Sequence, residues 1–402
     1  MMEKVGKYIT NYIKGKTPKV LLSTEEADSL PYLSPDYLRG VDVPEFYAKQ
    51  DSKSIVIDDG EVIVLWDGSN AGEILISKKG VLASTMTMLQ IDETQIDKAY
   101  FGYSFQNLEY ILKAKTAGSG IPHADKGVVS KLEFYKPSLP EQSAIAAMLS
   151  KVDEAIASVQ AGISAAERLK KSLMQNLLTG RMKPDGTLRK EDEFYLDEKF
   201  GRVPKGWEVK KLKDIADIQR GKFGHRPRND ERFYNGEYPF VQTNDVVESV
   251  FYLKKASQTL NELGISVSKF FPSGTIIMTI AANIGFVAIT NYKVYFPDSL
   301  IGINANEQII LSTYLLLQLM GYKNILDAQA TESAQKNINY SNLFPLLIPY
   351  PTDKQEQKQI VERIKKVFDT IENKQKKIAV LEKLKKSLMQ NLLTGRVRVT
   401  KK

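Results

Sequence analysis

A stretch of thirteen residues occurs twice in this chain, letter for letter. It runs from Leu169 to Arg181 and returns from Leu384 to Arg396, 215 positions later. The two copies align without a gap back to Glu141-Gln142 and Glu356-Gln357, with 22 identities in 41 positions. Identity of this extent does not arise by chance, so the chain contains an internal duplication, and a duplication restricts the possible folds more than composition does.

The duplicated unit has the pattern of a long helix with one apolar seam. Its apolar residues alternate in steps of four and three, which is typical of a coiled coil. Each copy closes with Leu-Leu-Thr-Gly, and a glycine just beyond the last apolar position ends a helix. A helix of roughly 38 residues is about 57 Å long. The predicted seam consists of Ile145, Val152, Ile156, Ile163, Leu173 and Leu177 in the first copy, and Ile360, Val367, Ile371, Ile378, Leu388 and Leu392 in the second.

Two such helices in one chain would most simply bury their stripes against each other. The linker after the first copy is short, so the second helix can return antiparallel beside the first. The alternative is an ordinary core helix in each of two duplicated domains. Helix length and heptad register favour the antiparallel coiled coil, and the duplication predicts pseudo-two-fold symmetry.

The chain of 402 residues is too long for one core and fits two domains of roughly 140–150 residues plus the helices. No apolar run approaches the ~18 residues of a membrane span, and the N-terminus lacks the apolar core of a signal peptide. The absence of cysteine excludes disulfides and thiolate zinc sites. We therefore expect a cytoplasmic protein. The formal charge of +8 suits a polyanionic partner, although many basic proteins share it.

The expected order is domain, helix, domain, helix, which gives an α+β fold with two α/β domains. We call these domains the first and the second head. The predicted boundaries are the first head at 1–139, its helix at 140–181, a linker and lead-in at 182–203, the second head at 204–354, its helix at 355–396 and a basic tail at 397–402.

The first head shows strand-like runs at 54–58, 61–66 and 73–76, with a tight-turn signal at Asp58-Asp-Gly60 and a helix at about 100–115. The second head echoes the first at three places. Lys14-Gly-Lys16 aligns with Arg220-Gly-Lys222, Pro31-Tyr-Leu33 with Pro239-Phe-Val241, and the loop Asn70–Gly72 with Asn283–Gly285. Near-identical helices with divergent heads indicate a fixed scaffold that presents two different recognition surfaces.

Residues for catalysis are sparse. The two histidines lie in different heads with no cysteine nearby, so a histidine-based metal site or a nucleophile–histidine relay is not expected. There is no P-loop and no glycine-rich dinucleotide loop. The Asn-x-Gly loops lack the Asn-Pro-Pro-aromatic motif that would hold a flipped base for methylation of its amino group. Asp185 with Lys199 imitates a metal-dependent nuclease signature, but it lies in the linker with no strand pattern between its parts.

Nucleic-acid binding has better support. Between Lys210 and Arg228 there are seven basic and two acidic residues, and the end of this run is interrupted by glycines. Basic side chains on loops suit phosphate contacts, and amides can read adenine in a bidentate manner. The alternative for any one residue is a solvated surface loop. The candidate DNA-binding residues are Lys14, Lys16, Thr17, Lys19, Ser69, Asn70, Ser119, His123, Arg220, Lys222, His225, Arg226, Arg228, Gln242, Asn244, Asn283, Gln335, Lys336 and Asn337.

The arrangement resembles the DNA-specificity subunit of type I restriction–modification systems. Three features carry the resemblance: Lys-Ser-Leu-Met-Gln-Asn-Leu-Leu-Thr-Gly-Arg at the end of both helices, Glu-Gln at the start of each, and the lead-in Gly201-Arg-Val-Pro-Lys-Gly-Trp207. Together they span almost the whole chain. The first head departs from the pattern because it lacks a Pro-x-Gly-Trp lead-in, so its edge is expected to pack differently or to be completed by the C-terminal tail.

The resemblance implies that each head is a target-recognition domain for one half of a bipartite DNA site. The helices would set the spacer and dock two adenine methyltransferase subunits, which bind S-adenosylmethionine. Two restriction subunits, motor-nucleases that use ATP and Mg²⁺, would join them. This chain would carry no catalysis and hold no cofactor or metal. The alternatives from other classes are a coiled-coil scaffold that binds only protein and a nuclease built around Asp185 and Lys199.

Overall fold

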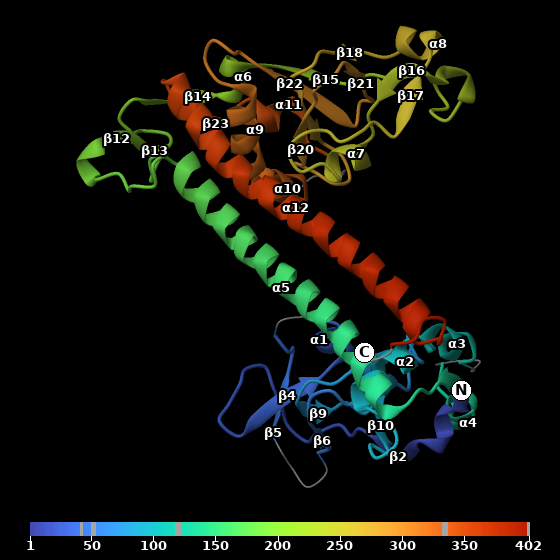
Figure 1. The fold of residues 1–402 in the computed structure, drawn as a ribbon. Coiled ribbons are helices and arrows are strands. Elements are labelled where there is room, and N and C mark those ends of the chain that lie inside the picture. The colour runs from blue at the N-terminus through green and yellow to red at the C-terminus, as the bar shows by residue number, and fades with distance from the viewer. Residues whose placement is uncertain (41–42, 50–53, 117–121, 332–336, 400–402) are drawn as a thin grey trace. The chain divides into compact units, whose positions relative to one another are not determined.

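The computed structural model describes residues 1–40, 43–49, 54–116, 122–331 and 337–399 (Figure 1). The chain forms two compact units. The first contains residues 1–160 and 376–402, and the second contains residues 161–375. Two long helices, α5 (Leu139–Leu178) and α12 (Lys354–Leu392), contribute residues to both units.

The first unit contains the first head. Its strands are β1 (Met2–Lys4), β2 (Ile9–Lys14), β3 (Leu21–Leu22), β4 (Ser29–Leu33), β5 (Tyr47–Lys49), β6 (Val56–Ile57), β7 (Val62–Leu65), β8 (Ile74–Ile76), β9 (Gly80–Leu82), β10 (Met86–Ile91) and β11 (Glu133–Tyr135). Its helices before α5 are η1 (Val5–Lys7), α1 (Pro35–Leu38), α2 (Lys98–Gln106), α3 (Glu109–Ala114) and α4 (Lys126–Lys131). They build sheets in the order β2-β10-β7-β8 and β3-β5-β4-β9-β6, with β1 paired to β11.

The second unit contains the second head. Its strands are β12 (Phe194–Asp197), β13 (Gly201–Pro204), β14 (Trp207–Lys211), β15 (Ala216–Arg220), β16 (Tyr234–Phe240), β17 (Gln258–Leu260), β18 (Phe270–Phe271), β19 (Ile276–Thr279), β20 (Val287–Ile289), β21 (Val294–Tyr295), β22 (Leu300–Ala305) and β23 (Leu347–Pro351). Its helices are η2 (Glu191–Glu193), α6 (Leu212–Ile215), η3 (Glu231–Phe233), α7 (Thr243–Val247), α8 (Glu262–Ser266), α9 (Ser312–Gly321), α10 (Lys323–Thr331) and α11 (Tyr340–Leu343).

The two heads share one strand order. The sheet β15-β22-β19-β20 of the second head corresponds to β2-β10-β7-β8 of the first. The second sheet, β17-β16-β21-β18, matches β5-β4-β9-β6, and each contains one parallel pair, β16 with β21 and β4 with β9. The pair β14–β23 corresponds to β1–β11. The α+β fold with two related heads and two long helices is therefore confirmed.

The long helices pair in both units. In the first unit Ile145 and Leu149, near the start of α5, share a core with Leu392 at the end of α12. In the second unit Leu173 and Leu177, near the end of α5, share a core with residues at the start of α12, including Ile360, Val367 and Ile371. The pairing is therefore antiparallel within each unit. The other predicted seam residues are half-buried: Val152, Ile156, Ile163, Ile378 and Leu388.

The repeated Glu-Gln pair anchors each helix start to its head. The Gln142 side chain is fully buried, accepts a hydrogen bond from the Asp97 N–H at 2.9 Å and donates to the Pro137 carbonyl at 3.0 Å. Gln357, equally buried, accepts from the Leu311 N–H at 2.8 Å and donates to the Pro351 carbonyl at 2.8 Å. A buried amide without partners would destabilise the fold, so this pairing explains why glutamine recurs.

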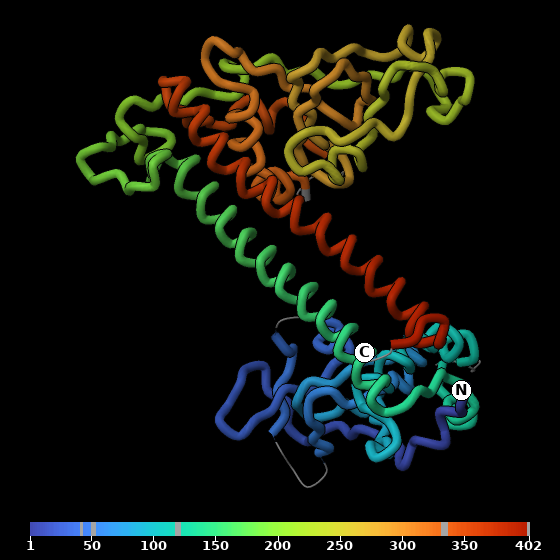
Figure 2. Tube along the Cα trace, in the orientation of Figure 1, coloured from blue at the N-terminus to red at the C-terminus, as the bar shows by residue number. Residues whose placement is uncertain are grey.

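The glutamate of each pair binds an arginine that follows the other helix. In the second unit Glu356 accepts hydrogen bonds from Arg189 and from the Trp207 indole. In the first unit Glu141 accepts them from Arg398 and from the Val399 N–H. The C-terminal tail thus supplies contacts where the first head has no tryptophan lead-in. Figure 2 traces the chain from the end of α12 into the first unit.

Two local features differ from the expectations. The helix expected at about 100–115 is divided into α2 and α3, since the turn at Asn107-Leu108 separates them. The segment 182–203, expected as a linker, contains most of the antiparallel hairpin β12–β13. Its strands alternate polar and apolar residues only briefly, so the periodic signal is weak. The tight turn expected at Asp58-Asp-Gly60 is present, with Gly60 at φ 82°. It joins strands of different sheets, since β6 pairs with β9 and β7 pairs with β8 and β10.

Candidate nucleic-acid interface

A basic–glycine–basic turn ends the corresponding strand in each head. A Cβ on Gly15 would lie 2.1 Å from the Ala83 carbonyl oxygen, and a Cβ on Gly221 would lie 2.3 Å from the Pro297 carbonyl oxygen. The glycine is therefore required by close backbone approach in both heads. The following lysine N–H donates to a carbonyl in each case, from Lys16 to Leu82 and from Lys222 to Phe296. These turns fix the direction in which their flanking basic residues leave the sheet.

In the first head, Asp67 brings together residues that are distant in sequence. Its carboxylate binds the Lys14 ammonium at 3.0 Å and the His123 Nδ1 at 2.6 Å. Burial alone would raise the pKa of Asp67, but the hydrogen bonds from His123 and Lys14 outweigh it and hold that pKa below its usual value. Ser69 and Asn70 are exposed in the loop that follows Asp67. The Asp67 carboxylate thus joins two predicted residues, Lys14 and His123, and two more, Ser69 and Asn70, follow it in the chain.

The other predicted residues of the first head lie along the segment after β2. Lys16, Thr17 and Lys19 are exposed, and the Thr17 hydroxyl bonds to the Ser84 hydroxyl at 3.0 Å. Ser119 lies outside the described residues.

In the second head, acidic residues hold the predicted basic side chains in place. Asp298 binds Arg228 and, at 3.6 Å, Arg226. The His225 ring stacks on Phe233 with 4.1 Å between ring centroids, and its Nε2 lies 2.9 Å from Asp230. Both arginines are about half exposed at their side chains, 53% for Arg226 and 46% for Arg228, so each keeps N–H groups available for an anion.

The pKa of Asp230 is held far below its ordinary value, chiefly by the hydrogen bond from Arg232. This carboxylate therefore stays charged and keeps its contact with His225 in the loop that also bears Arg228. Arg220 and Lys222 precede this loop. The Arg220 N–H donates to the Tyr340 hydroxyl at 2.7 Å, which fixes the backbone of the turn.

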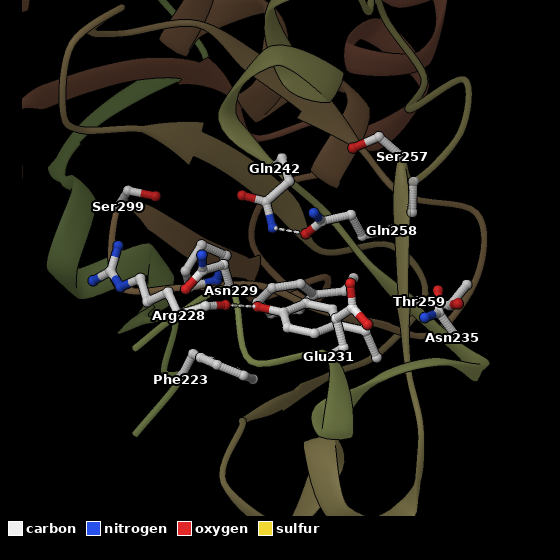
Figure 3. Close-up of a pocket in the computed structure, with 14 residues that line it drawn as sticks. Phe223, Arg228, Asn229, Glu231, Asn235, Gln242, Ser257, Gln258, Thr259 and Ser299 are labelled. Carbon is white, nitrogen blue, oxygen red and sulfur yellow. Dashed lines mark hydrogen bonds between the residues drawn. The ribbon is translucent and has the colours of Figure 1, made fainter. Parts of the chain in front are cut away.

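A polar cavity of about 570 Å³ opens beside the loop that ends in Arg228 (Figure 3). Its floor includes the buried aromatic rings Phe223 and Phe240. Among the polar residues around it, Gln242 donates from Nε2 to the Gln258 Oε1 at 2.9 Å. In Figure 3 Gln242 and Gln258 lie next to each other, joined by a dashed line, and away from Phe223. Amide, hydroxyl and guanidinium groups around one opening suit a partner that offers many donors and acceptors, such as base edges in a DNA groove.

The remaining predicted residues lie elsewhere in the second head. Asn244 is exposed in the first turn of α7, and Asn283 is exposed in the loop before Gly285. A β-bridge between Ala281 and Asn337 places Asn337 beside that loop. Gln335 and Lys336 lie outside the described residues.

Several residues that line the cavity are not among those predicted from the sequence: Asn229, Ser257, Gln258, Thr259 and Ser299. The polar run Lys254–Thr259 between strand-like segments was the available signal for three of them. Nothing in the sequence indicates that Gln258 meets Gln242, because the pairing depends on the register of β16 with β17.

The described residues contain no group of three or more His, Asp or Glu side chains that could hold a metal ion. The acidic residues of the nuclease-like pattern form turns instead. Asp185 accepts hydrogen bonds from the N–H and hydroxyl of Thr187, and Asp197 accepts from the N–H groups of Lys199 and Phe200. No helix among the described residues is long and apolar enough to cross a membrane.

Comparison with known proteins places the chain in a family. The family model described as the type I restriction modification DNA specificity domain matches twice, at residues 7–168 and 204–383. The type I restriction enzyme MjaVIII specificity subunit of Methanocaldococcus jannaschii is 32% identical, over 98% of this chain and 92% of the relative. The MjaIX specificity subunit of the same organism is 24% identical, over 96% and 90%.

Solved structures show the same fold. The crystal structure of a type I restriction–modification S subunit from M. genitalium matches with a TM-score of 0.63 at 15% identity, over 98% of this chain and 96% of that one. A chain from a study of complex assembly in the type I system matches with a TM-score of 0.54 at 16% identity, over 98% and 97%. The duplication, the two related heads and these matches lead to one conclusion: this chain belongs to the DNA-specificity subunits of type I restriction–modification systems, which are not catalytic.

Proposed function

We propose that the chain reads a bipartite DNA site, one half with each head. The observation that carries this proposal is that the heads share one strand order and one basic–glycine–basic turn but surround it with different side chains. Lys14 and His123 both bind Asp67 in the first head, whereas Arg226 and Arg228 bind Asp298 in the second. The shared strand order and turn are consistent with the same docking mode of both heads on DNA. The divergent loops are consistent with recognition of two different base sequences.

The helices would act as the ruler between the half-sites. Helix α5 has 40 residues and α12 has 39, and each is therefore about 60 Å long. Half-sites one helical turn apart lie about 34–36 Å from centre to centre, within the span of such helices. The antiparallel pairing in each unit would make the spacing depend on the seam.

The duplicated segment also supports docking of two copies of one partner. A seam needs only apolar residues, yet the identity extends to exposed positions. Leu169 is 50% exposed and its counterpart Leu384 is 46% exposed. Lys171 with Lys386 and Gln175 with Gln390 are likewise exposed and identical. Packing inside the chain does not require identical exposed residues, so we attribute them to two copies of the same subunit, the adenine methyltransferase.

In this proposal the chain holds no cofactor. S-adenosylmethionine belongs to the two methyltransferase subunits, and ATP and Mg²⁺ belong to the two restriction subunits that join the complex in the cytoplasm. The part of this chain is to choose the DNA sequence and to place its partners on it.

Salt-dependent DNA binding tests the proposal. The affinity of the complex of this chain with its methyltransferase for duplex DNA should fall steeply as salt rises, because phosphate contacts release counterions. The methyltransferase alone is the control. A protein-only scaffold would add no salt-dependent affinity to that control, and this result would contradict the proposal.

A further inference from the structure

A pair of glutamines in the second head forms a single hydrogen-bonding element. Gln242 follows the end of β16 and Gln258 begins β17, which pairs with β16 so that Gln258 lies opposite Phe240. The Gln242 Nε2 lies 2.9 Å from the Gln258 Oε1 (Figure 3). Both side chains line the polar cavity beside Arg228.

The hydrogen-bonding capacity of this pair is well defined. A primary amide offers one carbonyl oxygen and one NH₂ group. When one amide donates to the other, the pair leaves a carbonyl oxygen on the donating residue and an NH₂ group on the accepting residue. This result is the same whichever glutamine donates. The paired amides therefore present one acceptor and one donor side by side.

That combination matches the major-groove edge of adenine, which offers the N6 amino group as donor and N7 as acceptor. Guanine offers two acceptors on the same edge, cytosine a donor, and thymine an acceptor beside a methyl group. An acceptor–donor pair thus favours adenine over the other three bases.

A buried carboxylate holds both glutamines in position. The Asp245 side chain accepts a hydrogen bond from the Gln242 N–H at 2.8 Å and others from the N–H and hydroxyl of Ser257, each at 3.0 Å. Asp245 is only 6% exposed. It therefore joins the segment that bears Gln242 to the residue before Gln258, and it fixes the backbone at both ends of the pair.

The charges around the cavity favour a base edge over a phosphate. The Glu231 side chain lines the same cavity, and Asp298 neutralises Arg228 at its rim. A phosphate in the cavity would meet the Glu231 carboxylate, whereas a neutral base edge would not.

The corresponding positions of the first head, both among the described residues, carry no such pair. Pro31-Tyr-Leu33 corresponds to Pro239-Phe-Val241, so Ser34 occupies the position of Gln242. The Tyr32 N–H donates to the Phe46 carbonyl at 2.9 Å, which puts Phe46 at the position of Gln258. The phenylalanine has no polar side-chain atom and the serine has a single hydroxyl, so these two positions cannot form a pair of amides. The two heads therefore differ at the same point of their shared strand order.

We propose that Gln242 and Gln258 together read one adenine in the half-site of the second head, with Asp245 as their positioning residue. This inference rests on the proposed function, since it assigns one base of the site that the second head reads. It predicts an A·T pair at a fixed position of one half-site and makes no demand on the other half-site.

The test uses the full chain in complex with its methyltransferase. The wild-type methylated motif is first mapped in cells. Competition binding then compares duplexes that carry each of the four base pairs at every position of the motif. Gln258→Ala should reduce the preference for one A·T pair by about 5–150-fold, the range for loss of a bidentate base contact. Gln308→Ala, which changes another exposed glutamine of the same unit, is the matched control and should leave the preference unchanged.

The second variant guards against a folding defect. Gln258→Glu keeps the side-chain length and the acceptor for Gln242 but has no NH₂ group. The inference is supported if both variants lose base-pair preference at the same single position and keep the preference at the other half-site. Wild-type base preference in either variant overturns it. Uniform weakening of Gln258→Ala on all sequences overturns it too, since it would indicate a phosphate contact. The proposed function fails separately, if the wild-type complex shows no bipartite motif at all.

Discussion

Arg398 binds Glu141 across the first unit with two parallel hydrogen bonds, Nε to Oε1 at 2.8 Å and Nη2 to Oε2 at 2.7 Å. Glu141 lies in the first turn of α5, where a carboxylate also favours the helix dipole. Arg189 and Glu356 form the corresponding pair in the second unit. In each unit, an arginine that follows one long helix thus binds the glutamate at the start of the other long helix.

Replacement of Arg189 by alanine should lower the free energy of unfolding of the second unit by about 1.5–3 kcal/mol, because hydrogen bonds to a charged group are among the strong ones. The Arg189 side chain is 8% exposed, so solvent cannot substitute fully for Glu356. Denaturant unfolding of the full chain measures the change. Arg202→Ala, at a half-exposed side chain paired with Glu191, should change it far less.

Acid should weaken the first unit through Glu141. The hydrogen bonds from Arg398 hold the pKa of Glu141 below its ordinary 4.5, against the effect of burial. A carboxyl whose pKa is lowered on folding contributes stability above its unfolded pKa and loses it as pH falls through the folded pKa. Thermal unfolding between pH 6 and pH 3 should therefore show a steeper loss in the wild type than in Arg398→Ala. Parallel curves would contradict this role of Glu141.

A charge in the helix seam should change the spacing between half-sites while the heads remain folded. Leu173 is 7% exposed in the core that α5 and α12 share in the second unit. Leu173→Asp should cost about 2–5 kcal/mol, since it removes apolar packing and buries a charge. Methylation mapping reads the spacer, and Ala165→Asp, at an exposed position of the same helix outside the identical segment, is the control for the seam. An unchanged spacer in a destabilised Leu173→Asp variant would argue against the ruler.

Arg226 and Arg228 should serve one half-site only. Their replacement by alanine removes two cations beside the cavity of the second head and leaves the Lys14–Asp67–His123 group of the first head untouched. Recognition of one half-site should weaken, while the base preference at the other is retained, as measured by competition binding with half-site mutants. Equal loss at both half-sites would show that the heads do not act independently.

The basic–glycine–basic turns should tolerate no side chain at their centre. A Cβ at Gly221 would approach the Pro297 carbonyl oxygen to 2.3 Å, and the Phe296 ring lies at 2.5 Å. Because backbone is among these atoms, Gly221→Ala should cost about 1–3 kcal/mol, the usual range for overpacking. Thermal unfolding tests this, with Gly224→Ala in the same loop as control, since its nearest contact would lie at an ordinary 3.6 Å.

Much of the fold could be predicted from the sequence because the duplication is explicit. Thirteen identical residues locate both helix ends, and the Glu-Gln pairs locate both starts close to Leu139 and Lys354. The echoes Lys14-Gly-Lys16 and Pro31-Tyr-Leu33 located equivalent points of two diverged sheets. Such positions can be recognised in the sequence because a close backbone approach or a buried amide permits only a few residue types there.

The hairpin β12–β13 and the partner of Gln242 could not be predicted. Strands of four residues give too few alternations for a periodic signal. The meeting of Gln242 with Gln258 follows from strand register and from Asp245, a buried carboxylate that no local pattern identifies as shared by two segments. The residues that we propose to read the base therefore lie where local sequence patterns are least informative.

Methylation mapping in cells tests whether this chain reads a bipartite DNA site, one half with each head. The full chain is expressed with its methyltransferase, and every methylated adenine in the genome is recorded. If the two heads read one half-site each, the methylated motif is bipartite, with a fixed number of unspecified bases between its halves. Adenine methylation at a single continuous motif, or none while the same methyltransferase is active with another specificity chain, would contradict it.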